Sequence, residues 1–206
     1  IYTSTSEVYG SAQYVPMDEA HPLRGQSPYS ASKIAADKMA EAFHKSFELS
    51  VVTVRPFNTY GPRQSPRAIV PTIIGQCLFG DSLRLGSLDP VRDLTFVEDT
   101  VEGFLSASAC PEAAGRVLNL GTGSGVSIRE LVDLVAEVVG RSPSLEIEDQ
   151  RKRPAASEVS RLIADNTAMR ELTGWEPRTS LEEGVRMTAA WIREHAEGWR
   201  YGTYAI

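Results

Sequence analysis

The chain has 206 residues, of which 42% are hydrophobic and 23% are charged, and its formal net charge is −6. This size and composition are those of a soluble globular protein with an ordinary core, and the acidic balance argues against a general nucleic-acid or acidic-membrane surface. No apolar run approaches the roughly 18 residues that a membrane span needs. Cys77 and Cys110 lack metal-ligand spacing, as do the histidines, so we expect no metal site and reduced, packed thiols in the cytoplasm.

The first part of the chain alternates helix and strand signals. Residues 1–9 predict the end of a strand and a turn, and because Ile1 is already in mid-strand, we expect the chain to begin inside a fold. From Pro28, small and apolar residues recur with helical spacing to about Leu49. The β-branched run Val51–Val54 then predicts a buried strand, and a helix followed by such a strand indicates α/β architecture.

The remaining chain carries further signals of this kind. Its patterns predict, in order, a helix over residues 69–79, a strand over 82–85, a helix ending near Ala109 and a strand over 117–120. A serine followed three residues later by a glutamate is typical of a capping box. Two such pairs predict two more helices, and the pairs are Ser127 with Glu130 and Ser180 with Glu183.

A glycine-rich segment, G-T-G-S-G at residues 121–125, follows a predicted strand and precedes a predicted helix, as a dinucleotide-binding loop does. Its glycine spacing does not match G-x-G-x-x-G, and it lies far down the chain rather than at the start of a mononucleotide-binding half. We therefore interpret this segment as a tight turn.

Tyr29 and Lys33 lie four residues apart in the predicted helix, so their side chains share one face. A free tyrosine has a pKa near 10, and this pKa must fall by about 3 units before tyrosine acts as a base near neutrality. A nearby ammonium group and a cationic cofactor ring both shift the pKa in that direction. Because such pairs are also common on solvated helices, the pair gains meaning only from its neighbours.

Four motifs accompany one another along the chain: T-S-E-V-Y-G, Y-S-A-S-K, V-R-P-F-N-T-Y-G-P-R and V-R-D-L-T-F-V-E-D. With these motifs the chain resembles, from residue 1 to about 195, the extended short-chain dehydrogenase/reductase family of NAD-dependent nucleotide-sugar epimerases and dehydratases. The resemblance implies an α/β fold in which residues 1–60 form the C-terminal part of a Rossmann-like, doubly wound parallel sheet. Residues 61–206 would form mainly a smaller α/β substrate-binding domain, with the chain returning to the sheet around residues 90–120.

The resemblance also implies a cofactor. Family members begin with a glycine-rich strand, turn and helix that hold the dinucleotide pyrophosphate, and we expect this N-terminal third to be absent here. In the family the Tyr-Lys pair binds NAD and moves a proton. This implies that Tyr29 is the catalytic base and that Lys33 holds the nicotinamide ribose, with Pro56 and Phe57 as further cofactor-binding residues.

The opening motif separates two reactions within the family. Epimerases usually carry a small neutral residue at its third position, whereas dehydratases carry a carboxylate there, here Glu7. The resemblance implies that Thr5 bonds the sugar 4-oxygen and that Glu7 is the acid and base at C5. Ser6 occupies the position at which some dehydratases carry an aspartate acid. The implied reaction is a 4,6-dehydration, in which C4 is oxidised, water leaves across C5 and C6, and NAD is regenerated.

For the substrate, arginine is the residue that holds a diphosphate with paired donors. The resemblance implies a nucleotide-sugar substrate, UDP- or GDP-linked, with an N-acetylhexosamine of nonulosonic acid pathways as one candidate sugar. The substrate-binding residues that it implies are Asn58, Arg67, Arg92 and Arg153.

Three alternatives remain open at this point: a UDP-glucose-type 4-epimerase, a UDP-glucuronate decarboxylase, and a non-catalytic nucleotide-sugar binding fragment. The decarboxylases share T-S-E-V-Y-G, but their tyrosine helix typically reads Y-D-E-G-K-R, unlike Y-S-A-S-K-I here. As in the family, we expect a homodimer that packs through the helix from Tyr29 to Leu49.

Overall fold

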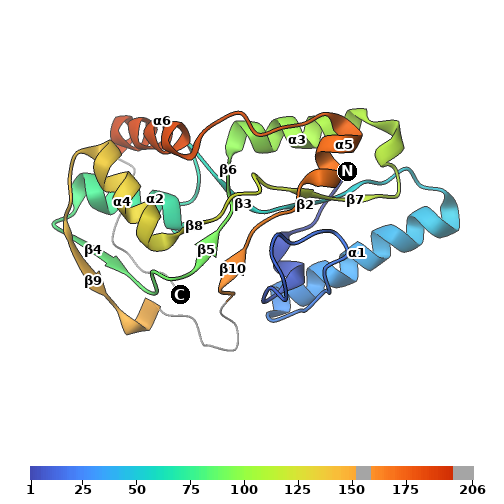
Figure 1. The fold of residues 1–206 in the computed structure, drawn as a ribbon, viewed down its shortest axis with the longest axis horizontal. Coiled ribbons are helices and arrows are strands. Elements are labelled where there is room, and N and C mark those ends of the chain that lie inside the picture. Colours follow the sequence, from blue (N-terminus) through green and yellow to red (C-terminus); the bar gives the residue numbers. More distant parts are fainter. Residues whose placement is uncertain (152–158, 197–206) are drawn as a thin grey trace. The chain divides into compact units, whose positions relative to one another are not determined.

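The computed structural model describes residues 1–151 and 159–196, which fall into two compact units (Figure 1). Unit 1 is formed by Ile1–Thr59, Val91–Gly125 and Ala155–Arg178, and unit 2 by Tyr60–Pro90, Val126–Pro154 and Thr179–Ile206. Within the described ranges, none of the helices has both the length and the apolar character of a bilayer span.

Unit 1 is built around a parallel sheet with the strand order β1-β2-β7. Its register pairs Tyr2 with Thr53 and Thr53 with Val117. The elements of this unit are β1 (Tyr2–Thr3), η1 (Ser6–Tyr9), α1 (Pro28–Phe47), β2 (Thr53–Pro56), β3 (Asn58–Tyr60, whose last residue belongs to unit 2), β5 (Val91–Arg92), β6 (Leu94–Phe96), α3 (Val97–Ala109), η2 (Pro111–Ala113), β7 (Val117–Leu120), β10 (Arg161–Leu162) and α5 (Thr167–Thr173).

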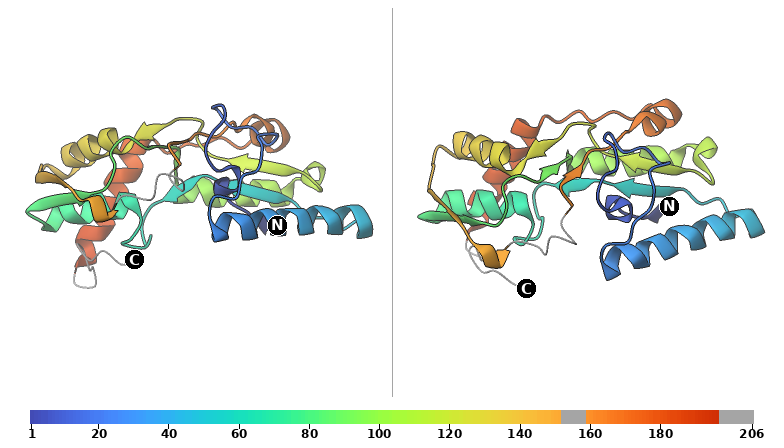
Figure 2. Two further views of the ribbon diagram at one scale, coloured as in Figure 1. Left: turned by 90° about the horizontal axis from the view of Figure 1, so that it is seen from below. Right: turned by 60° about the horizontal axis from the view of Figure 1, so that its bottom comes forward.

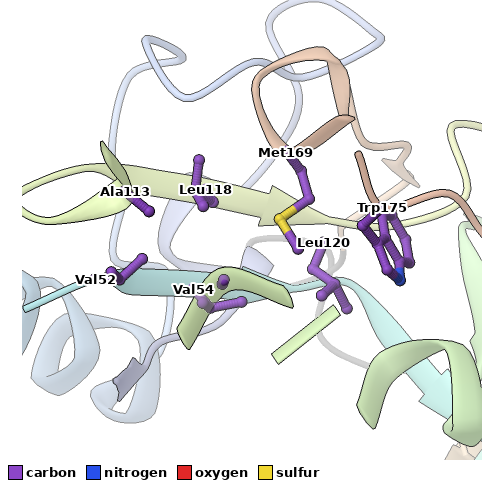
Figure 3. Close-up of a cluster of buried hydrophobic side chains, with 8 residues drawn as sticks. Val52, Val54, Ala113, Leu118, Leu120, Met169 and Trp175 are labelled. Atoms are coloured by element: carbon purple, nitrogen blue, oxygen red, sulfur yellow. The ribbon is translucent and has the colours of Figure 1, made fainter. Parts of the chain in front are cut away.

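One face of this sheet carries an apolar core. This cluster contains side chains from the β2 segment, β7, α3, η2 and the α5 region, and Figure 3 labels all of its residues except Ala107. The residues are Val52, Val54, Ala107, Ala113, Leu118, Leu120, Met169 and Trp175. Because side chains alternate along a strand, Thr53 and Arg55 point to the opposite face. There the Arg55 guanidinium meets Asp37 of α1. Helix α1 and the pair α3 and α5 therefore cover opposite faces, as a doubly wound sheet requires.

The strand β2 differs from the sequence prediction, which placed it at Val51–Val54. Both ends lie two residues later, at Thr53 and Pro56, because each residue from Thr53 to Pro56 pairs with β7. The sequence suggested an end at the charged Arg55, but this side chain is only 4% exposed and is neutralised by Asp37.

The G-T-G-S-G segment is a turn that surrounds a carboxylate of the chain itself. The backbone N–H groups of Thr122 and Gly123 donate to the two oxygens of Asp93, at 2.8 and 2.9 Å. A Cβ at Gly121 would lie 2.8 Å from Asp93 Oδ2, so the approach requires glycine. The pKa of Asp93 is raised because the carboxyl group is buried, and the hydrogen bonds from these donors offset part of that rise. The predicted tight turn is thereby confirmed.

Unit 2 groups α2, α4 and α6 against one another, with the parallel pair β4–β9 beside α2 (Figure 2). Ser127 and Glu130 form the predicted reciprocal capping box, and Gly140 ends α4 with a φ of 73°. At α6 the structure shows one half of the predicted box, in which Ser180 Oγ accepts from Glu183 N. The elements are α2 (Ile69–Phe79), β4 (Ser82–Leu85), β8 (Val126–Ser127), α4 (Ile128–Val139), β9 (Ser144–Ile147), η3 (Asp149–Arg151) and α6 (Leu181–Glu194).

Candidate active site

The opening motif folds into the end of β1 and the short helix η1. Thr5 is the N-cap of η1, and its Oγ1 accepts a hydrogen bond from Glu7 N at 3.2 Å. Ser6 is buried, whereas Thr5 and Glu7 are half-buried. Gly10 closes the turn with a φ of 63°, and a Cβ there would lie 2.6 Å from Arg24 O. This turn holds the Glu7 backbone in place directly after the strand.

The N-terminus of α1 fixes the second motif. Ser27 and Ser30 cap each other reciprocally, and Pro28 takes the first helical position, where its missing N–H costs nothing. Tyr29 is consequently held in the first turn, with 51% of its surface exposed. Within the part of the chain that the structure describes, its hydroxyl has no hydrogen-bond partner. It is therefore open to a ligand.

Lys33 ties α1 to the end of β1. Its Nζ donates to Thr3 O at 3.0 Å and lies 5.5 Å from the centroid of the Tyr2 ring. Burial raises the pKa of Tyr2, with smaller contributions from Asp37 and Tyr29. Helix α1 also packs against η1, so the helix that carries Tyr29 and Lys33 lies against the segment that carries Glu7.

The predicted cofactor- and substrate-binding residues fall at different places. Pro56 ends β2, and Phe57 is buried in a second core cluster beside Tyr9. Asn58 begins β3, and no donor among the described residues bonds its buried Oδ1. Arg92 is half-buried in β5, where its Nη1 donates to Val91 O at 3.0 Å.

The structure does not place the two remaining predicted arginines with these residues. Arg67 is exposed and belongs to unit 2. Arg153 lies outside the described residues. The structure therefore gathers Thr5, Ser6, Glu7, Tyr29 and Lys33 in unit 1, together with Asn58 and Arg92 in the same unit.

Comparison with known proteins adds the family. The model described as GDP-mannose 4,6 dehydratase matches residues 1–188. The chain belongs to the GDP-mannose 4,6-dehydratase family. Its relatives include both kinds of enzyme that the sequence suggested. A dTDP-glucose 4,6-dehydratase of Streptomyces griseus is 37% identical over 97% of this chain. A UDP-glucose 4-epimerase of Mycolicibacterium smegmatis is 33% identical over 96% of this chain.

A solved structure supports the fold of this family member. The dTDP-glucose 4,6-dehydratase of Bacillus anthracis, solved in complex with NAD, superposes with a TM-score of 0.87 at 30% identity, covering 96% of this chain and 62% of that one. The chain spans 60% and 63% of the two curated relatives named above. The resemblance to NAD-dependent nucleotide-sugar epimerases and dehydratases and the Rossmann-like α/β fold, both inferred from the sequence, are confirmed.

Sequence reasoning missed a buried polar network in unit 1, which involves the two helices, η1 and α1, that carry the candidate catalytic residues. Arg55 donates to Asp37 and to the Tyr9 hydroxyl, and that hydroxyl donates to Asn119 Oδ1 at 2.6 Å. Two signals were available: a charged residue inside an apolar strand, and an acid one turn after Lys33 on the helix. Neither signal indicates which residue is the partner.

A cavity of about 450 Å³ in unit 1 is separate from the candidate site, because none of the predicted catalytic, cofactor-binding or substrate-binding residues lines it. Asp37 and Arg55 line it, and its other α1 residues lie between Asp37 and the C-terminal end of the helix. The lining residues are Glu19–Leu23, Asp37, Lys38, Glu41, His44, Lys45, Val51, Thr53, Arg55 and Gly115–Val117.

Proposed function

We propose that this chain is the catalytic part of an NAD-dependent nucleotide-sugar 4,6-dehydratase. The observation that carries the proposal is the position of Glu7, a half-buried carboxylate in η1, and this short helix packs against α1, the helix of Tyr29 and Lys33. A 4-epimerase needs the tyrosine and the lysine but has no use for a base at C5. The similarity to dTDP-glucose 4,6-dehydratases supports the same reading.

The residues present fit NAD. Lys33 uses one of its three N–H donors on Thr3 O, which leaves donors for the hydroxyls of a ribose. The exposed Tyr29 side chain precedes Lys33 by one helical turn on the same face of α1. When bound, NAD supplies reversible two-electron oxidation of the sugar. Because Tyr29 and Lys33 share one face of α1, both side chains are available to one bound cofactor.

Each side chain has a role defined by the proton that it moves or the hydrogen bond that it donates. Tyr29 takes the proton of the C4 hydroxyl as C4 is oxidised, and Thr5 donates a hydrogen bond to the C4 oxygen. The resulting ketone acidifies the C5 proton, which Glu7 removes. Glu7 then gives this proton to the departing C6 hydroxyl, which leaves as water. The hydride removed from C4 would return to C6, so that NAD would be regenerated. Glu7, reprotonated from solvent, would supply the new proton at C5, and Tyr29 would release its proton to solvent.

Mass spectrometry of nucleotide sugars tests the proposal. The full-length protein should convert at least one UDP-, GDP- or dTDP-linked hexose to a product lighter by one water. An isomer of unchanged mass would favour the 4-epimerase, the second candidate, which the 33% identity to a UDP-glucose 4-epimerase supports.

Arg92→Ala is expected to weaken nucleotide-sugar binding while the NAD content stays the same, because we assign its guanidinium to the substrate diphosphate and not to the cofactor. Loss of one charge-assisted contact corresponds to roughly 10- to 100-fold in affinity. Calorimetric titration of the full-length protein with the nucleoside diphosphate measures the effect. Arg129→Ala, an exposed arginine of α4, is the matched control, and equal affinities of the two variants would remove Arg92 from the site.

Helix α1 is proposed as the dimer contact. Phe43 and Phe47 pair on its surface with ring centroids 5.5 Å apart and are 44% and 72% exposed, and Met39 beside them is 60% exposed. Light scattering should give twice the chain mass for the full-length protein and a monomer for Phe43→Ser/Phe47→Ser. The control Val101→Ser/Leu105→Ser changes exposed apolar residues of α3 and should leave the dimer intact. A wild-type monomer at micromolar concentration would refute this contact.

We place the protein in the cytoplasm. Both cysteines are free, and burial raises the pKa of Cys77 to about 11, which suits a packed thiol in a reducing compartment.

A further inference from the structure

A chain of buried polar groups joins three elements of unit 1. Arg55 of β2 donates two hydrogen bonds to Asp37 Oδ2, at 3.0 and 2.8 Å, and a third to the Tyr9 hydroxyl at 2.9 Å. The exposed fractions of these residues are 4%, 5% and 0%. Burial raises the pKa of Tyr9 to about 12, so its hydroxyl stays neutral and donates onward to Asn119. We call this chain of three residues the Tyr9–Arg55–Asp37 bridge.

The two ends of the bridge lie on the elements that carry the proposed catalytic residues. Tyr9 is the last residue of η1, the short helix that carries Glu7. Asp37 follows Lys33 by one helical turn and Tyr29 by two, so these three residues lie along one face of α1. The bridge therefore ties the helix that bears the base for C5 to the helix that bears the base for the C4 hydroxyl.

Stability alone is a poor explanation for such a bridge. A buried ion pair often contributes no more than apolar residues of the same volume, because both charges lose their hydration. Its distinctive property is geometric: the planar guanidinium presents its donors in a fixed fork, here with two of them on one carboxylate oxygen and another on the phenol. Catalytic groups must be held to within about half an ångström, which is the kind of constraint that this fork supplies.

We propose that Tyr9, Arg55 and Asp37 are positioning residues that fix Glu7 relative to Tyr29 and Lys33. This proposal rests on the proposed dehydratase function, in which Tyr29 and then Glu7 act on the same sugar. It assigns no contact with substrate or cofactor to the three residues.

Tyr9→Phe is the test, because it removes one hydroxyl and keeps the ring in its core. In the full-length protein we expect kcat to fall about tenfold or more with little change in KM, since misplacement of a reacting group lowers the rate and not substrate binding. Exchange of the C5 proton with deuterated solvent should slow by the same factor. Thr188→Val, which removes a buried hydroxyl from α6 in unit 2, is the matched control and should keep the wild-type kcat.

A second measurement does not depend on the reaction. In hydrogen–deuterium exchange, Tyr9→Phe should increase uptake in peptides covering residues 1–10 and 28–40 and leave residues 181–194 unchanged. A kcat within twofold of wild type, or unchanged uptake in both peptides, would overturn the positioning role. If the wild-type protein dehydrates no nucleotide sugar, the proposed function fails, whereas the exchange measurement still decides whether the bridge holds the two helices.

Discussion

Replacing Glu7 by glutamine is expected to stop the reaction after C4 oxidation. The amide keeps the size of the side chain but cannot take the C5 proton, whereas Tyr29 and Lys33 still serve the first step. Removal of one acid–base group typically costs on the order of 100-fold or more in rate. In a single turnover with the full-length protein, mass spectrometry should detect a 4-keto sugar that has lost no water, and exchange of the C5 proton should vanish.

The control for this variant is Glu102→Gln, which changes an exposed glutamate of α3. It should form product at the wild-type rate. If Glu7→Gln also forms the 4-keto-6-deoxy product at that rate, Glu7 is an ordinary turn residue and the epimerase becomes the better account.

The second large effect concerns stability. Asp37→Ala leaves the Arg55 guanidinium, whose side chain is 4% exposed, without its carboxylate. Breaking a buried pair by removing one partner typically costs about 3–5 kcal/mol, because an uncompensated charge stays buried. We therefore expect a large fall in the free energy of unfolding, measured by urea denaturation of the full-length protein.

Two further variants serve as controls for the loss of unfolding free energy in Asp37→Ala. Glu182→Ala breaks an ion pair with Arg186 in which both side chains are about 60% exposed, at 59% and 60%, and should cost at most about 1 kcal/mol. Asp37→Leu/Arg55→Met removes both buried charges together and should recover much of the lost stability. If Asp37→Ala costs no more than Glu182→Ala, the bridge is not a buried ion pair in solution.

Much of the fold could be predicted because local signals agreed with the tertiary structure. The strand at Val117–Leu120 and the helix at Ile69–Phe79 have the predicted bounds, since their apolar runs end at Gly121 and Gly80. Helix α1 ends two residues before Leu49 because Glu48 adopts a left-handed conformation, with a φ of 55°. The short helix α5 was missed, since its burial depends on contacts with α3 and β7, far away in the sequence.

The candidate site divides in the same way. Spacing along one helix was enough to relate Tyr29 to Lys33, and motif order related both to Glu7. The partnership of Arg55 with Asp37 and Tyr9 arises only when strand, helix and turn pack together. The predicted role of Asn58 remains a prediction, and its buried Oδ1, with no partner among the described residues, is consistent with a ligand that donates a hydrogen bond.

The most direct measurement of the central claim is the NMR spectrum of the product that the full-length protein forms from a nucleotide hexose in deuterated water. A 4,6-dehydratase in which Glu7 exchanges the C5 proton predicts a 4-keto-6-deoxy sugar with deuterium at C5 and a new methyl group at C6. A C4 epimer that keeps its C6 hydroxyl and carries no deuterium would contradict the account.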